Sequence, residues 1–448
     1  MPTTAIKGRG PSMKCNGAGE DANGEVAERC GALDAPPGTT PVPMHRLDAR
    51  SDDEISAWLQ NRHEVVSERN IWAFWDKGFN KLPPWTKRNV MNWVRKLGPD
   101  WTVHVLDNAA GSETNVGHYL DSSFFPEAFN KGMMDGPTVG QHQADLIRLP
   151  LLWKYGGIWL DVGTILFCHV DGLCWKQIED PETPYEMAAC AMELRPGVDQ
   201  MTNTFIAARR GNPFVKRWHD IFVAIWGSET NAFATSFHTH PLVSHIPLPS
   251  LPADKLSCPE PTISMEFLSD YLAHYLAMER LRKLIDPNDG FNGPAYYAKH
   301  VFLLPSMDEM YYLQAFSQWN GAREFAILAT KRSGDGAQMD ESWETAERLV
   351  NHLLANTAMM KLSHAPPKEA PFLADLWNTE EHSEADESPG TFAARMRYGS
   401  VHFEQTRKPR PMEIKLETEG ILHLGLLEHE ATSDGCNVRA SDDLAVRA

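Results

Sequence analysis

Residues 141–164 read QHQADLIRLPLLWKYGGIWLDVGT, and this stretch decides both the fold class and the candidate site. We expect a helix over residues 141–155, followed by a break at Gly156–Gly157. A short β-type run over residues 158–160 then ends at Asp161. A helix that leads into a strand with an acidic residue at its end is typical of a ligand site in an α/β protein.

The polar residues of this stretch suit a diphosphate and a divalent metal. Asp145 and Arg148 are one helical turn apart, so they share a face. Arginine presents several donors in a fixed plane that matches phosphate oxygens. The two glycines allow close backbone approach. Asp161, at a strand end, supplies the hard oxygen that Mg²⁺ or Mn²⁺ prefers, and such an ion would neutralise a departing diphosphate.

Each feature also has an ordinary structural interpretation. An Asp–Arg pair on a helix is usually a surface ion pair worth about 0–1 kcal/mol. Two glycines before a strand often form only a turn, and an aspartate at a strand end is commonly a cap. The combination within one short stretch favours the site interpretation.

Strand and helix signals alternate through the chain. Strands separated by helices predict a mostly parallel sheet covered by helices, with ligands at the carboxyl ends of the strands. We expect an interruption or kink in the helix at Pro150, which lacks a backbone donor. The expected strands are residues 70–75, 101–106, 158–160, 164–167 and 205–209, and the expected helices are 87–97, 141–155, 213–226, 266–285 and 342–358.

The chain divides into three regions. Residues 1–50 are rich in Gly, Pro, Ala and Thr, which predicts a disordered tail. Residues 51–376 form the globular domain. Residues 377–448 are predicted to be an acidic linker and a C-terminal extension. Within that extension, residues 412–417 alternate apolar and polar side chains, and with the apolar run 421–427 they predict a β hairpin.

Composition limits the partners and the compartment. The 448 residues carry 60 acidic against 42 basic side chains, for a net charge of −18, which disfavours nucleic acid and anionic membrane surfaces. Part of the excess lies in residues 380–387, which we expect to be a solvated run. No stretch of about 18 apolar residues predicts a membrane span. Seven scattered cysteines without a CxxC pair, and no recognisable signal peptide, predict reduced thiols in a cytoplasmic protein.

The stretch ADLIRLPLLWKYGGIWLDVGT resembles the central motif of the capsular polysaccharide synthesis protein family. That family lies within the superfamily of sugar-binding-region glycosyltransferases that carry a DxD motif. Its members are similar to GT-A enzymes, which have a Rossmann-like fold. These enzymes transfer a sugar from a nucleotide-sugar donor, usually with Mn²⁺ or Mg²⁺. The likeness covers roughly residues 70–365, and it is strongest at 141–164.

The resemblance implies a role for individual residues of this chain. Asp145 and Arg148 match the donor-contacting pair, and Asp161 matches the first Asp of DxD. An aromatic residue of the first strand lies beside the nucleotide base, and stacking there is worth about 1–3 kcal/mol, although core packing is the commoner fate of tryptophan. The implied donor site consists of Trp72, Trp75, Asp145, Arg148, Gly156, Gly157, Trp159 and Asp161.

The chain departs from the superfamily at Gly163, where a second Asp would stand. A single carboxylate holds a cation less well, so the metal site is expected to combine Asp161 with His364 and the donor diphosphate. His364 lies in a K-L-S-H stretch that resembles a terminal element of the family, and it also reads as an ordinary loop histidine.

These observations predict a soluble GT-A-like glycosyltransferase that moves a hexose from a UDP- or GDP-sugar to a hydroxyl acceptor, with Mn²⁺ or Mg²⁺. The alternatives are an inactive sugar-nucleotide-binding protein and a carbohydrate-binding scaffold. No catalytic base can be chosen, since Asp107, Asp135 and Glu266 are equally open to that role.

Overall fold

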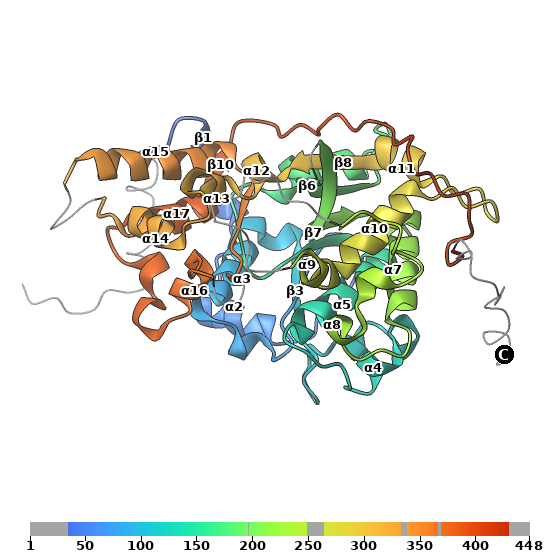
Figure 1. Ribbon diagram of the computed structural model, residues 1–448. Coiled ribbons are helices and arrows are strands. Elements are labelled where there is room, and N and C mark those ends of the chain that lie inside the picture. The colour runs from blue at the N-terminus through green and yellow to red at the C-terminus, as the bar shows by residue number, and fades with distance from the viewer. Residues whose placement is uncertain (1–34, 196, 249–263, 333–337, 366–368, 430–448) are drawn as a thin grey trace, which may run out of the picture.

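A computed structural model describes residues 35–195, 197–248, 264–332, 338–365 and 369–429 (Figure 1). Its centre is a six-stranded sheet of order β3-β2-β4-β7-β6-β8. Strand β7 is antiparallel to both of its neighbours, and the other five strands share one direction. The mostly parallel α/β sheet expected from the sequence is therefore confirmed. The strands are β2 Asn70–Phe74, β3 Thr102–Leu106, β4 Gly157–Leu160, β6 Met187–Arg195, β7 Val198–Ala208 and β8 Val301–Pro305.

Helices cover both faces of this sheet, which explains why β2 and β4 are buried along their whole length. In β2 all five residues are buried, with Trp72 in the core on one face and Ile71 in the core on the other. The Trp72 face is covered by α5 Val139–Tyr155, α7 Pro213–Trp226 and α10 Ala273–Lys283, and the Ile71 face by α2 Asp52–Leu59 and α3 Pro84–Leu97.

The predicted helices are present with small changes in their bounds. Helix α7 has the predicted bounds, because the Asn212 side chain caps it and Pro213 fits its first turn. Helix α5 runs through Pro150 without interruption. The helix expected over 266–285 is two helices, α9 Met265–Tyr271 and α10, which meet at Leu272.

A separate helical layer lies beside the sheet and forms its own apolar core. It contains the helix predicted near residues 342–358 and several short helices that the sequence pattern does not predict. Its helices are α13 Tyr312–Ser317, α14 Gly321–Ala329, α15 Glu341–Asn356, α16 Leu373–Trp377 and α17 Phe392–His402.

The strand predicted over 164–167 exists as β5 Thr164–Leu166, but it does not join the main sheet. It pairs antiparallel with β9 Met359–Lys361, a strand that the sequence pattern does not predict. This pairing fixes the chain after Asp161 against the helical layer.

The predicted C-terminal hairpin is wrong. No strand is present in residues 406–429, which run along the outside of the fold (Figure 1). The backbone N–H of Met412 donates to Leu303 of β8 at 2.7 Å, and Leu422 bridges to Leu284. Met412 and Ile414 instead pack against the core beside β8, whereas Leu416 is exposed, so the pattern reflects partial burial of an extended segment and not self-pairing.

Disorder over residues 1–50 is tested only in part, because residues 1–34 lie outside the described residues. For residues 35–50 the prediction is wrong. Strand β1 Thr39–Pro41 pairs antiparallel with β10 Phe403–Gln405, and the next residue, Val42, donates to His402 at 2.8 Å. The low apolar content of this segment is offset by backbone hydrogen bonds to a distant strand.

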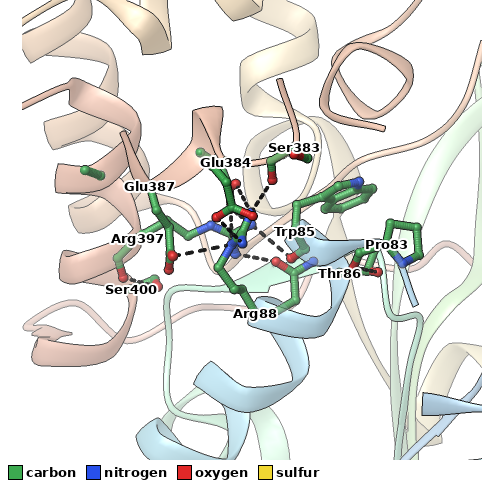
Figure 2. A network of polar contacts seen from close by, with 12 residues as sticks. Pro83, Trp85, Thr86, Arg88, Ser383, Glu384, Glu387, Arg397 and Ser400 are labelled. Atoms are coloured by element: carbon green, nitrogen blue, oxygen red, sulfur yellow. Dashed lines mark hydrogen bonds and ion pairs between the residues drawn. The ribbon is translucent and has the colours of Figure 1, made fainter. Parts of the chain in front are cut away.

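The prediction of a solvated acidic run over residues 380–387 is wrong for Asp386, whereas Glu380, Glu381, Glu384 and Glu387 are exposed as expected. The Asp386 side chain is fully buried between Arg88 of α3 and Arg397 of α17, whereas Glu384 is exposed. Figure 2 shows both arginines directed toward this acidic segment. The ion pairs tie α17 to α3. The domain boundary after residue 376 stays a prediction.

Candidate active site

The candidate site lies where β4 ends, near the middle of the sheet. Asp161 follows β4 directly, and its N–H donates to Thr204 of β7 at 3.2 Å. Its C=O accepts from the N–H of Thr164 at 3.0 Å, which closes the turn formed by the D-V-G-T residues. The register of Trp72 with Trp159 brings the carboxyl ends of β2 and β4 to the same edge. This edge is where a mostly parallel sheet places its ligands.

Gly156 and Gly157 lie at the opposite end of β4 from Asp161, about 13 Å along the strand. Both have positive φ, and a Cβ on Gly157 would come within 2.4 Å of the Asn70 carbonyl oxygen. They let α5 turn into a strand close to β2. The structure therefore does not bring these glycines together with Asp161, and their requirement for glycine is explained by backbone packing.

Asp145 and Arg148 form a buried ion pair beneath the site. An Nη2–Oδ1 distance of 2.8 Å joins them, and the guanidinium lies 4.9 Å from the centre of the Trp159 ring. Arg148 also donates through Nη1 to the Asn203 carbonyl oxygen at 2.6 Å. The Asn203 side chain donates to Asp145 at 3.0 Å and lies 3.1 Å from the His274 ring nitrogen Nδ1. The Arg148 guanidinium therefore already contacts Asp145, Asn203 and Trp159 within the protein.

Asn203 and His274 are not among the predicted site residues. Asn203 lies on β7 and His274 on α10, and both are brought to α5 only by the fold. Neither residue belongs to the stretches at 141–164 and 361–364 that carry the family resemblance, so those motifs do not indicate them.

The two aspartates of the site have opposite pKa shifts. Burial raises the pKa of Asp145 to about 7, and the attraction of Arg148 only partly opposes that rise. Burial also raises the pKa of Asp161, but Lys361, Arg148 and the Trp159 indole N–H outweigh it, so the net pKa falls below the usual value. At neutral pH Asp161 is therefore ionised, whereas Asp145 holds its proton to a higher pH than an exposed aspartate does.

Lys361 contacts Asp161 directly, and it is not among the predicted site residues. Its Nζ lies 3.1 Å from Asp161 Oδ2, across 200 positions of sequence. The other oxygen, Oδ1, accepts from the Trp159 Nε1–H at 2.9 Å and lies 3.8 Å from Arg148 Nη2. The K-L-S-H stretch is the sequence signal that could have indicated this lysine, which begins it.

His364 is directed to a different partner from the one expected. Its Nδ1 lies 2.7 Å from Asp375 Oδ1, and the side chain is half exposed. Among the described residues, no group of three or more His, Cys, Asp or Glu side chains is placed to hold a metal ion. The structure therefore does not assemble the Asp161–His364 ligand pair that the sequence suggested.

The side chains around Asp161 do not fit a divalent ion. Both carboxylate oxygens already have donors, and one donor is the Lys361 ammonium. A divalent ion about 4 Å from that ammonium would be repelled by about 2 kcal/mol even in bulk water, and by more at lower dielectric. Dependence on Mn²⁺ or Mg²⁺ stays a prediction.

The two candidate base-stacking tryptophans differ in exposure. Trp72 is fully buried, donates to the Gly156 carbonyl oxygen at 2.9 Å and stacks on His104 with 4.3 Å between ring centres. A ligand could not reach its ring without displacing core side chains. Trp75, at the carboxyl end of β2, is partly exposed, and its buried Nε1–H has no hydrogen-bond partner among the described residues.

The three acidic residues considered as a catalytic base lie in different environments. Asp107 is buried and accepts hydrogen bonds from Ser112 and Thr114, which explains it as a loop-closing residue. Asp135 and Glu266 are exposed. The geometry therefore selects none of them.

Helix α3 holds the turn that follows Asp161 from the other side. The Asn89 side chain donates to the Val162 carbonyl oxygen at 2.8 Å, and the Trp93 indole donates to the Thr164 carbonyl oxygen at 3.0 Å. Asn89 in turn accepts from Arg397, which pairs with Asp386. A polar chain thus runs from the acidic segment to the D-V-G-T turn.

Comparison with known proteins defines the class of this protein. The chain is 55% identical to the O-glycosyltransferase braB of Annulohypoxylon truncatum, over 88% of this chain and 94% of that protein. It is 42% identical to the glycosyltransferase afumC of Aspergillus fumigatus, over 86% and 99%. It is 39% identical to the O-glycosyltransferase PaGT of Phomopsis amygdali, over 88% and 96%. These relatives show that the chain is a glycosyltransferase.

The family of the chain is established in the same way. The capsular polysaccharide synthesis protein family matches residues 44–276, and the chain belongs to this family. The resemblance carried by the central motif is confirmed. Among solved structures, the PaToxG glycosyltransferase matches 51% of this chain and 92% of its own with 14% identity and a TM-score of 0.24, which is too weak to define the fold. Within the described residues, no helix has the length and apolar character needed to cross a membrane.

Proposed function

We propose that this glycosyltransferase uses a UDP- or GDP-sugar as donor and transfers a hexose to a hydroxyl group of the acceptor. The observation that carries the proposal is the ionised Asp161 at the carboxyl end of a central strand, held in place by Trp159 and bordered by positive charge. Such an edge suits a nucleotide diphosphate, because the leaving group develops negative charge that fixed cationic and dipolar groups stabilise.

Different parts of the site would contact different parts of the donor. Trp75 would stack on the base; its partial exposure supports this role, whereas Trp72 is enclosed in the core. Asp161 would accept hydrogen bonds from hydroxyls of the ribose or the sugar. The buried Asp145–Arg148 pair would help to orient Asp161, because Arg148 Nη2 lies 3.8 Å from Asp161 Oδ1. Mn²⁺ or Mg²⁺ remains the counter-ion that the family resemblance suggests.

The acceptor is proposed to react through oxygen. Two of the relatives are named O-glycosyltransferases, which supports a hydroxyl nucleophile for this chain. The acceptor would be a glycan or another hydroxyl compound.

A second candidate function is sugar-nucleotide binding without turnover. Gly163 stands where the superfamily has a second Asp, and Lys361 neutralises the remaining carboxylate. Both functions require donor binding, so they differ only in whether the nucleotide is released.

The test is a nucleotide-release assay across UDP- and GDP-sugars, with Mn²⁺ or with chelator. The wild type is compared with Asp161→Asn, and with Asp220→Asn as a matched control that also removes an Asp–Lys pair. Release from one donor that is lost only in Asp161→Asn supports the proposal. Binding of a donor without release, also with a panel of hydroxyl acceptors, supports the second candidate. Donor binding that Asp161→Asn leaves unchanged contradicts the site.

A further inference from the structure

The ion pair between Lys361 and Asp161 occupies the position where a metal centre was expected. The Lys361 side chain is 16% exposed and that of Asp161 is 23% exposed, so the pair faces solvent and is not sealed in the core. A ligand that reaches Asp161 therefore also reaches the Lys361 ammonium.

The backbone holds Lys361 in this place independently of the ion pair. Lys361 pairs with Thr164 across β5 and β9, and its N–H donates to Met310 at 3.2 Å. Its C=O accepts from the Gln314 side chain at 2.7 Å. These bonds aim the Lys361 side chain at the turn after Asp161, so the ammonium does not depend on Asp161 alone for its position.

Gly163 is explained by the same contact. A Cβ on Gly163 would lie 2.8 Å from the Leu362 carbonyl oxygen and 3.2 Å from Lys361 Nζ. The Leu362 N–H also donates to the Gly163 carbonyl oxygen at 2.9 Å, which fixes the two segments together. A second aspartate therefore has no room here, because β9 and the Lys361 ammonium fill the space that its side chain would need.

A site of two carboxylates with a divalent cation and the Asp161–Lys361 pair have the same net charge. Two carboxylates with a divalent cation sum to zero, and so do one carboxylate and one ammonium. An ammonium is a compact point charge with three donors, and lysine is an established binder of phosphate oxygens. Lys361 therefore supplies, beside the single carboxylate of Asp161, a positive charge that can contact phosphate oxygens.

We propose that Lys361 is a donor-binding residue whose ammonium contacts the diphosphate directly, in the place of a divalent ion and the second carboxylate. This inference rests on the proposed function, because it requires a nucleotide-diphosphate donor. It predicts that the diphosphate binds without metal, and that the binding depends on the charge of Lys361.

The experiment measures binding of UDP and GDP to the full chain by calorimetry, in chelator and in Mn²⁺, with uridine and guanosine as competitors that lack phosphate. We expect the wild type to bind one diphosphate in chelator within about threefold of its affinity in Mn²⁺. Lys361→Met should weaken that diphosphate about 10- to 100-fold, as expected for a hydrogen bond to a charged group, and leave the nucleoside unchanged. Lys361→Arg should retain most of the affinity.

Lys216→Met is the matched control, because Lys216 also pairs with an aspartate, Asp220, on the surface of α7. Thermal melts of each variant confirm that it is folded. Wild-type binding that requires Mn²⁺, or Lys361→Met binding equal to that of the wild type, overturns the role of Lys361 and leaves the proposed function intact. Absence of diphosphate binding under every condition refutes the proposed function itself.

Discussion

Replacement of Asp386 by Asn should destabilise the protein more than its place in an acidic run suggests. The Asp386 carboxylate is fully buried, with Oδ2 at 2.6 Å from Arg397 and 3.1 Å from the Nε of Arg88. Arg397 is 3% exposed, so the substitution removes the buried carboxylate that its guanidinium contacts directly. Removal of one partner from a buried ion pair typically costs about 3–5 kcal/mol, and we expect a loss of that size in the free energy of unfolding.

Glu384→Gln is the matched control for this substitution. Glu384 pairs with the same Arg88 at 2.9 Å, but its side chain is 71% exposed. A solvent-exposed ion pair contributes about 0–1 kcal/mol, so the control should change stability little. Urea unfolding followed by intrinsic fluorescence measures both variants against the wild type, with refolding checked on dilution.

The effect of Asp386 should also depend on pH. Burial raises its pKa, but Arg397 and Arg88 outweigh burial and hold the net pKa below the usual 3.8. Its contribution is thus present above that value and is lost as pH falls through the lower, folded pKa. The stability gap between wild type and Asp386→Asn should narrow below about pH 4. A cost for Asp386→Asn below about 1 kcal/mol at pH 7, equal to that of Glu384→Gln, would refute the reasoning.

Three further outcomes are expected at the site. The free energy of unfolding of Asp145→Asn should rise relative to that of the wild type between about pH 4 and 7, by up to about 4 kcal/mol. The reason is that Asp145 loses its proton near pH 4 in the unfolded chain but only near pH 7 in the folded protein, so the wild type becomes less stable across this range. A difference in urea unfolding that does not change with pH contradicts this. Gly163→Ala should cost about 1–3 kcal/mol and weaken donor binding, since its Cβ meets the Leu362 carbonyl oxygen at 2.8 Å; unchanged unfolding and calorimetry would show that the turn adapts. Trp75→Ala should weaken UDP or GDP binding by about 1–3 kcal/mol. Trp72→Phe should lower the urea midpoint and leave the affinity of the folded protein unchanged. Weaker binding in Trp72→Phe with unchanged binding in Trp75→Ala would assign the stacking role to Trp72.

The features that the sequence predicts correctly are local. The stretch from Gln141 to Thr164 predicts a helix, a glycine break and a strand that ends at Asp161, and all three are present. Helix α7 is predicted with its bounds, because the Asn212 and Pro213 start signals act within one turn. Such features depend on neighbours a few positions away, so periodicity and end signals are enough to find them.

The wrong predictions concern partners that are distant in the chain. The alternating residues 412–417 predict a strand of a hairpin, but the Met412 N–H donates to Leu303 of β8 instead. The acidic run predicts a solvated segment, but Asp386 lies between two arginines from α3 and α17. The contacts of His364 and Lys361 are also set by distant segments, because His364 pairs with Asp375 and Lys361 contacts Asp161, whereas the metal-binding role expected of His364 stays a prediction. Charge and apolar patterns indicate what a segment can bury or pair with, but they do not say which segment will be there.

The sequence by itself determined the family and the place of Asp161 at a strand end, because both depend on the single stretch 141–164. It also determined the α/β sheet, because strand and helix periodicity is local. Only the tertiary structure decided what surrounds that carboxylate. The pairing of β5 with β9 brings Lys361 to Asp161 across 200 positions and closes the space beside Gly163. Burial likewise separates Trp72 from Trp75, which sequence could not do. The reason is physical: pKa, pairing and exposure depend on which groups meet in space, and that is set by the packing of the whole chain.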